Sequence, residues 1–219
     1  MLEASILGRA RAAGIVDVET VQIRYFATDK HHTVDDPPAG GGAGMVMRVD
    51  VVCAAMDDVR KRDPQTHVIL LDARGKLFSQ RRARALARLP HIAFVCGRYE
   101  GIDARVEHFV DEVISVGDFV LSGGEIAALA VFDAVVRLLP GALGNEASSV
   151  DESHTTGLLE HRQYTKPKSF RGHDIPDVFF SGNHAAIAKE RRTDSVRLTV
   201  ERRPDLWVRR RERAHEDSL

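Results

Sequence analysis

Cysteine is scarce in this chain of 219 residues, which contains only Cys53 and Cys96. Neither belongs to a Cys-x-x-Cys pair or to a His/Cys cluster, which argues against a disulfide scaffold and against a structural zinc site. The ten histidines form no His-Glu-x-x-His motif. The best cluster, His31-His32 near Asp35-Asp36, is better explained by solvated or hydrogen-bonded side chains, so we expect no metal site.

Long apolar runs and an excess of one charge are also missing. The longest apolar stretch, residues 126–139, is interrupted by Asp133 and Arg137 and is too short to span a bilayer. The N-terminus has no signal-peptide pattern, so we expect a cytoplasmic protein with no membrane partner. The net charge is -1, but basic residues outnumber acidic ones over residues 189–213. Such a local patch can hold RNA on a neutral protein.

The hydrophobic pattern is typical of an α/β protein. Apolar runs of strand length at 68–71, 92–95 and 113–116 follow or precede helical stretches. This alternation predicts a parallel sheet with helices on both faces. Ser79 is a plausible N-cap for a helix over 80–89. The remaining expected elements are helices at 2–13 and 49–62, a strand at 18–26 and a glycine-rich loop at 29–44.

The composition changes after Leu139-Pro140-Gly141. Residues 144–176 are polar and show no periodicity, and a loop of this length is usually functional or a linker. The region 183–213 is helical in pattern and is broken once, at Pro204. We therefore predict an α/β domain over 1–144, an interdomain linker over 145–176, and a small helical domain over 177–219.

Two glycine-rich segments directly follow predicted strands, at 96–103 and at 115–125. In open α/β sheets, ligands bind outside the carboxyl ends of the strands, and glycine allows the backbone to approach them closely. We expect these loops to form one pocket for a flat ligand, with plain structural turns as the alternative. A third glycine-rich segment, 40–45, fits neither a dinucleotide fingerprint nor a P-loop, and a surface loop is its alternative.

The predicted helix at 125–139 is apolar nearly all round, so we expect it to be buried. Its exceptions, Asp133 and Arg137, are four residues apart and can form an internal ion pair. The functional interpretation is that the Arg137 guanidinium lies beside the pocket and stabilises developing charge.

Together these segments resemble the bacterial tRNA (guanine-N1) methyltransferases, the TrmD family of the SPOUT superfamily. The matching motifs follow the family's order over nearly the whole chain. They are the segments 34–47, 96–103, 115–125, 137–144, Gly157-Leu-Leu-Glu160, Tyr164-Thr-Lys-Pro167, Ser181-Gly-Asn-His184 and Arg202-Arg-Pro-Asp-Leu206.

The resemblance implies an α/β domain tied in a C-terminal trefoil knot that binds S-adenosylmethionine, with Mg²⁺ left open as a second cofactor. It also implies a homodimer with active sites at its interface, and tRNA methylation at guanine N1 of position 37, beside the anticodon. The implied substrate-binding residues are Asp36, Gly41, Gly42, Ser181, Asn183 and His184. The implied donor-binding residues are Asp72, Gly75, Cys96, Gly97, Arg98, Tyr99, Glu100, Gly101, Ser115, Val116, Gly117, Phe119, Leu121, Gly123 and Gly124.

The resemblance also assigns catalytic roles. Guanine N1 carries a proton that a carboxylate must accept, while a cation stabilises the charge that spreads onto O6. Arg137 matches the family's catalytic arginine. Alignment on Gly157-Leu-Leu159 places Glu152 where the family has a basic aspartate, and Asp151 beside it is the alternative.

The chain departs from the family pattern at several points. It begins just after the family's opening strand, so either its start is misassigned or truncated, or its sheet lacks a strand at a cost in stability. Ala39 replaces a tyrosine, Glu190 replaces a tryptophan, and Asp72-Ala-Arg-Gly75 replaces Ser-Pro-Gln-Gly. A catalytically weakened paralogue that binds RNA and donor is therefore the second hypothesis. A nucleotide-dependent oxidoreductase is disfavoured, because no acidic residue has the ribose-binding spacing.

Overall fold

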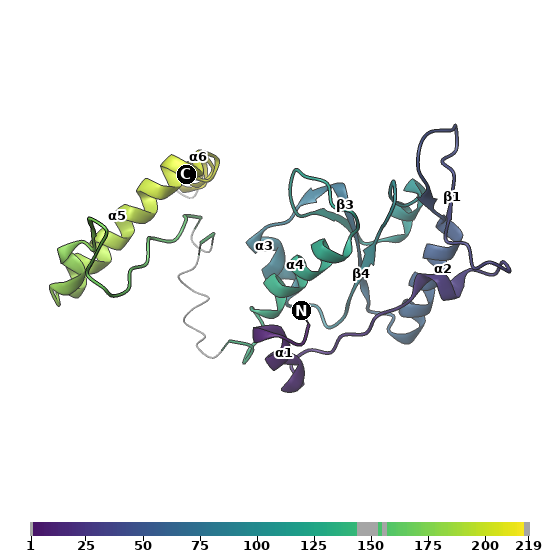
Figure 1. The fold of residues 1–219 in the computed structure, drawn as a ribbon, viewed down its shortest axis with the longest axis horizontal. Coiled ribbons are helices and arrows are strands. Elements are labelled where there is room, and N and C mark those ends of the chain that lie inside the picture. The colour runs from purple at the N-terminus through teal and green to yellow at the C-terminus, as the bar shows by residue number, and fades with distance from the viewer. Residues whose placement is uncertain (1, 144–152, 155–156, 217–219) are drawn as a thin grey trace. The chain divides into compact units, whose positions relative to one another are not determined.

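The computed structural model describes residues 2–143, 153–154 and 157–216. The chain divides into two compact units, residues 1–144 and residues 145–219 (Figure 1). No helix in the described part of the chain is long and apolar enough to cross a membrane.

The first unit is built on a parallel sheet of three strands, β3 (His67–Leu77), β4 (Ile92–Cys96) and β5 (Glu112–Ser115). Their order is β4-β3-β5, so β3 is central and pairs in parallel with both neighbours. The three predicted strands and their parallel arrangement are confirmed. β3 is longer than predicted, because it continues past Leu71 with a register shift before Lys76.

Helices cover both faces of this sheet, as predicted (Figure 1). Side chains alternate across a strand, so Val68 and Leu70 of β3 face one side while Ile69 and Leu71 face the other. The first pair packs with α2 (Val49–Arg62). The second packs with α3 (Gln80–Leu86) and α4 (Glu125–Val136). Ser79 caps α3 as expected, since its side chain accepts the Arg82 N–H at 3.3 Å.

The N-terminal helix α1 (Ser5–Ala12) packs through Leu7 and Ala10 against Val136 near the end of α4. The strand predicted at 18–26 is wrong. In its place is the short 3-10 helix η1 (Ile23–Phe26), and Tyr25 is 82% exposed. Residues 17–24 line, together with β4, a second cavity of about 840 Å³ and form no ladder with that strand. A high β-propensity yields a strand only where a partner strand and a packing surface are present.

Two smaller elements complete the first unit. The glycine-rich region is flanked by the paired two-residue strands β1 (Asp35–Asp36) and β2 (Val46–Met47), and η2 (Ala104–Phe109) follows the loop after β4. The expectation that α4 is buried all round is wrong. Ile126 is 58% exposed and Asp133 is also exposed, because α4 packs on the sheet along one face only.

The second unit holds the hairpin of β6 (Ser169–Phe170) and β7 (His173–Asp174), followed by η4 (Asp177–Phe180). Two helices follow, α5 (His184–Arg202) and α6 (Pro204–Glu216). The predicted break at Pro204 is confirmed, since proline fits the first turn of a helix but not its interior. The Asn183 side chain caps α5 by accepting the Ala186 N–H at 3.0 Å.

Candidate functional site

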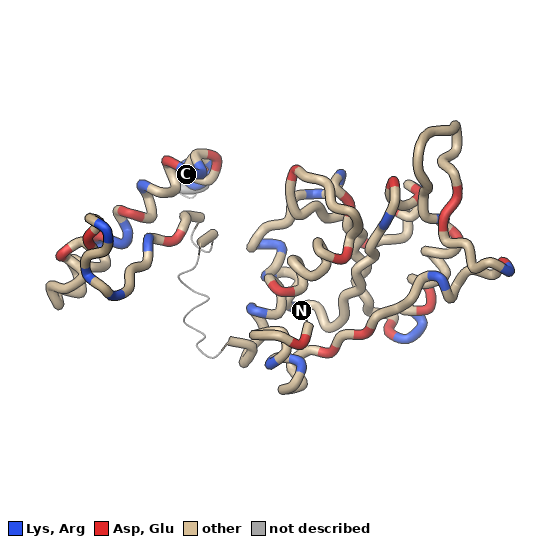
Figure 2. Tube along the Cα trace, in the orientation of Figure 1, with Lys and Arg blue, Asp and Glu red and all other residues tan. Residues whose placement is uncertain are grey.

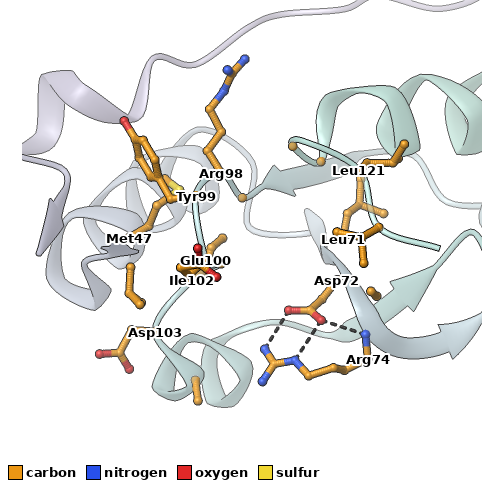
Figure 3. Close-up of a pocket in the computed structure, with 18 of the residues that line it drawn as sticks. Met47, Leu71, Asp72, Arg74, Arg98, Tyr99, Glu100, Ile102, Asp103 and Leu121 are labelled. Carbon is orange, nitrogen blue, oxygen red and sulfur yellow. Dashed lines mark hydrogen bonds and ion pairs between the residues drawn. The ribbon is translucent and has the colours of Figure 1, made fainter. Parts of the chain in front are cut away.

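The two glycine-rich loops that follow β4 and β5 are joined directly. The Gly124 N–H donates to the Gly97 carbonyl at 2.9 Å, and Arg98 and Gly123 form an isolated antiparallel bridge. Both loops line one cavity of about 950 Å³ at the carboxyl ends of the three strands (Figure 3). This is the edge of an α/β sheet at which ligands bind.

The segment after the third glycine-rich stretch forms another wall of this cavity. The Glu100 N–H donates to the Met45 carbonyl, and the Met47 N–H donates to the Gly101 carbonyl, both at 3.0 Å. Gly44 has a φ of +82° and lies against the Glu100 side chain, where a Cβ would overlap it. Asp36 of β1 also lines this cavity, together with the loops after β4 and β5.

Glycine is required sterically at Gly124. A Cβ there would lie 2.8 Å from the Cα of Cys96, within backbone that cannot move independently. Gly117 has a φ of +157°, and a Cβ there would meet the Phe119 ring. The Ser115 hydroxyl fixes this second turn by accepting the Gly117 N–H at 3.2 Å. Backbone atoms thus form much of the wall between the loops, which leaves room for a flat ligand.

Arg98 and Arg74 stand at the cavity, each in an ion pair and each mostly exposed. Arg98 contacts Glu125, the first residue of α4, at 2.7 Å. Arg74 contacts Asp72 at 2.7 Å, and its hydrogen bond holds the pKa of Asp72 below the ordinary value despite partial burial (Figure 3). The lining also contains apolar side chains, Leu71, Ile102 and Leu121 among them, and further charged ones from Arg48, Asp50, Asp103 and Arg105. The cavity therefore combines apolar side chains with charged and backbone polar groups.

The structure brings most of the predicted donor-binding residues to this one cavity. Those that line it are Asp72, Gly97, Arg98, Tyr99, Glu100, Gly101, Ser115, Val116, Gly117, Phe119, Leu121, Gly123 and Gly124. Sequence reasoning missed Met47, Ile102, Asp103 and Ala127, which also line it. An apolar side chain gives no indication in the sequence that it lines a binding site, although Met47 belongs to the segment 34–47 and Ile102 to the segment 96–103.

Four predicted residues lie elsewhere. Gly75 is not among the lining residues and packs against β5, where a Cβ would lie 2.6 Å from the carbonyl carbon of Ile114. Cys96 lines the second cavity, and burial raises the pKa of its thiol to about 11. Gly41 and Gly42 belong to the glycine-rich loop but do not line the donor cavity. The structure therefore does not bring Gly75 and Cys96, predicted to bind the donor, or Gly41 and Gly42, predicted to bind the substrate, to the lining of this cavity.

Of the three predicted catalytic residues, the structure describes only Arg137. Asp151 and Glu152 lie outside the described residues. Arg137 follows α4 at its C-terminal end, whereas Gly124 and Ala127 at the other end line the cavity. The ten residue steps from Ala127 to Arg137 span about 15 Å along the helix, so Arg137 lies well away from the residues of α4 that line the cavity. The interpretation that it lies beside this pocket is wrong for a single chain.

The predicted substrate residues of the second unit have local structural roles. Asn183 caps α5, and the Ser181 hydroxyl donates to the Val178 carbonyl at 2.7 Å. His184 is the first residue of α5 and is exposed. Among the described residues, no group of three or more His, Cys, Asp or Glu side chains is arranged to hold a metal ion.

A parallel sheet with a glycine-walled cavity at its carboxyl edge is typical of the α/β proteins that bind a nucleotide-sized ligand. A family model described as tRNA (Guanine-1)-methyltransferase TrmD matches residues 1–209. The chain therefore belongs to the TrmD family.

Similar proteins named tRNA (guanine-N(1)-)-methyltransferase include one from Chelativorans sp., 54% identical over 94% of this chain and 88% of its own length. The relative from Bartonella henselae is 53% identical with the same coverage. The relative from Roseobacter denitrificans is 51% identical over 95% of this chain and 87% of its own length.

Proposed function

We propose that this protein methylates N1 of guanine at tRNA position 37, beside the anticodon, with S-adenosylmethionine as the methyl donor, in the cytoplasm. The observation that carries the proposal is the family match over residues 1–209, since similar proteins are named tRNA (guanine-N(1)-)-methyltransferase. The cavity between the loops after β4 and β5 supports it, because it is the kind of site that the donor requires.

The residues of the cavity fit S-adenosylmethionine. Its volume of about 950 Å³ is at the upper end of the range for small-molecule sites, and its apolar side chains and backbone polar groups suit a flat adenine. Gly117 and Gly124 allow the backbone to approach the ligand closely. When bound, the donor supplies an electrophilic methyl group. The proposed role of the surrounding chain is to hold and orient it.

The proton chemistry falls to the residues of the chain. Guanine N1 is a poor nucleophile until its proton leaves, and Glu152 is proposed to accept that proton, with Asp151 as the alternative. Arg137 is proposed to stabilise the negative charge that spreads onto guanine O6. Catalysis otherwise consists mainly of holding N1 in line with the methyl group.

A homodimer with shared active sites is part of the proposal. The position of Arg137, about 15 Å along α4 from Ala127 in its own cavity, supports it, because a site formed with a second copy would give that guanidinium a cavity to act on. The trefoil knot in the α/β unit is proposed on the family resemblance.

The second unit is proposed to bind tRNA. Its helices α5 and α6 are rich in arginine, and residues 189–213 contain ten Lys and Arg against five Asp and Glu. Figure 2 shows basic residues distributed along both helices. Phosphate groups bind to such surfaces through counterion release, independently of base sequence.

The test is a methyl-transfer assay with an unmodified tRNA transcript that has guanine at position 37, followed by nucleoside analysis. We expect 1-methylguanosine at that position, and none with a matched transcript that has adenine there. Repeating the assay with EDTA tests the requirement for Mg²⁺. Donor binding measured by calorimetry without any 1-methylguanosine would contradict the proposal and select the weakened paralogue.

A further inference from the structure

Two large aromatic rings in the second unit are exposed, and each has a cation over its face. Phe170 is 61% exposed and Phe180 is 53% exposed. The Lys168 ammonium lies 5.1 Å from the centre of the Phe180 ring, and the Arg171 guanidinium lies 5.2 Å from the centre of the Phe170 ring. Exposed apolar groups that gather in one place mark interaction surfaces.

The local fold holds these four side chains on one framework. Phe170 ends β6, and Arg171 and Gly172 form the hairpin turn with φ values of 51° and 80°, which is the backbone of a tight two-residue turn. The Ile175 N–H donates to the Lys168 carbonyl at 2.9 Å, which extends the hairpin. The Lys168 ammonium contacts Asp177 at 2.7 Å and so ties the hairpin to η4, whose last residue is Phe180.

The charge around these rings favours a nucleic acid over a protein as the partner. Residues 161–180, which include both rings, contain four Lys and Arg against two Asp, and this excess of basic side chains attracts phosphate. Lysine is depleted from the buried centres of protein interfaces, yet Lys168 lies directly over the Phe180 ring. Aromatic rings interleaved with basic side chains are the usual platform for unpaired bases.

The reaction chemistry also requires unpaired bases near the enzyme. Guanine N1 lies on the Watson–Crick edge, so the target must be unpaired and reachable when its proton is removed. Proteins recognise single-stranded RNA loops by stacking the splayed bases on aromatic side chains. Bases beside an extruded guanine lose a stacking neighbour and need a new one.

We propose that Phe170 and Phe180, with Lys168 and Arg171, form a stacking platform for unpaired bases of the RNA substrate. This inference rests on the proposed function, because it takes tRNA as the substrate. The rings supply stacking, while the cations contact the phosphates that flank the stacked bases.

The experiment compares Phe170→Leu and Phe180→Leu with Phe170→Trp and Phe180→Trp in the full chain. Leucine keeps apolar bulk but has no aromatic face, so each leucine variant should weaken tRNA binding by about fivefold or more. The tryptophan variants should bind at least as well as the parent. The salt dependence of tRNA binding should stay unchanged in the leucine variants. Arg171→Gln should instead make the slope of log affinity against log salt concentration shallower, by about the contribution of one phosphate contact.

A second probe separates this inference from the proposed function. A single-stranded oligoribonucleotide with 2-aminopurine should change its fluorescence when bound to the parent, and less so with the leucine variants. If the parent methylates tRNA but the leucine variants bind both RNAs as the parent does, only the stacking platform is wrong. If these variants instead lower the dimer fraction in sedimentation, the rings belong to a protein contact and the inference is overturned. If the parent binds neither RNA, both proposals fail.

Discussion

Gly124 is a residue where a single added methyl group should distort the cavity that we propose for the donor. Its φ of -75° is ordinary, so substitution strains nothing in its own backbone. The cost arises because a Cβ would lie 2.8 Å from the Cα of Cys96, in the seam that joins the two loops. We expect Gly124→Ala to weaken S-adenosylmethionine binding by roughly tenfold to a hundredfold, as overpacking does. Isothermal calorimetry measures this affinity.

The matched control is Gly172→Ala in the hairpin of the second unit. Its Cβ would meet nothing within 4 Å, so donor affinity should stay at the parental value although the φ of +80° strains the turn. A folded Gly124→Ala protein with parental affinity would place the donor somewhere other than this cavity.

Cys96 lies at the end of β4, and burial raises the pKa of its thiol to about 11. Only the thiolate reacts with alkylating agents, and at pH 8 roughly one thiol in a thousand is ionised at such a pKa. We expect iodoacetamide to modify Cys96 far more slowly in the native protein than in urea. The rate, followed by mass spectrometry, should rise about tenfold per pH unit up to pH 10. Rapid native labelling at pH 8 would disprove this.

The choice between Glu152 and Asp151 as the base is also a question at the residue scale. Glutamate has the carboxylate chemistry of aspartate but one more methylene, and a displacement of ~1 Å can lower a rate by about a hundredfold. We expect Glu152→Gln to abolish methyl transfer with donor affinity kept, and Glu152→Asp to match or exceed the parent. Single-turnover assays measure the chemical step. If Asp151→Asn loses turnover and Glu152→Gln does not, Asp151 is the base.

At the scale of elements, α5 anchors the segment that follows the proposed base. The Leu159 N–H donates to the Thr199 hydroxyl at 2.9 Å, and the Arg162 N–H donates to the Asp194 carboxylate at 2.8 Å. Both side chains on α5 are buried. A buried carboxylate is tolerated only when it is paired and hydrogen-bonded, and Arg197 at 2.5 Å supplies the paired charge.

This anchor should make the stability of the second unit depend on pH. Burial opposes ionisation of Asp194, but the hydrogen bonds from Arg197 and the Arg162 N–H outweigh it and lower its pKa. A carboxylate whose pKa is lower in the folded protein than in the unfolded one stabilises the fold when the pH is above the unfolded pKa, which is near 3.9. This contribution is lost as the pH falls through the folded pKa. We expect Asp194→Asn to lower the midpoint of thermal unfolding at pH 7, and to lower it less at pH 3.

The exposed ion pair of Asp205 with Arg203 provides the comparison. Surface pairs contribute little, so Asp205→Asn should shift the unfolding midpoint only slightly at either pH. Circular dichroism at 222 nm follows both variants. Equal effects of the two substitutions at pH 7 would show that burial of Asp194 does not matter.

At the scale of the whole molecule, the proposed dimer makes a prediction about mixed subunits. Arg98 lines the donor cavity of its own chain, whereas Glu152 and Arg137 are proposed to act on the cavity of the second copy. Mixing inactive Arg98→Ala and Glu152→Gln proteins under exchange conditions should give hybrids with one intact site each. The activity should recover to about a quarter of the parental value, since half of the dimers are hybrids with one site of two.

The control for this experiment mixes Glu152→Gln with Arg137→Ala. If both residues act on the partner's cavity, no hybrid site is complete and the activity should not recover. Sedimentation should give a dimer at micromolar concentration for the parent and all three variants. A monomeric parent with full activity would rule out shared sites.

The sequence by itself determined the layers of the first unit. The apolar runs at 68–71, 92–95 and 113–116 became parallel strands because their alternating side chains are buried on both faces, a property that each run carries locally. The cap at Ser79 and the helix break at Pro204 were predictable for the same reason, since each depends on a few adjacent residues. The glycine motifs likewise located most of the lining of the cavity that we propose for the donor, because they follow the strands directly.

Features that depend on contacts between residues far apart in the sequence were decided only by the tertiary structure. Residues 18–26 have the composition of a strand but lie beside β4 without pairing, since a ladder requires a neighbour in register. Gly75 and Cys96 belong to donor motifs, yet one packs against β5 and the other lines a different cavity. Arg137 lies one helix length from the pocket that its motif implied. Adjacency in sequence fixes local conformation, whereas which side chains meet depends on how whole elements pack.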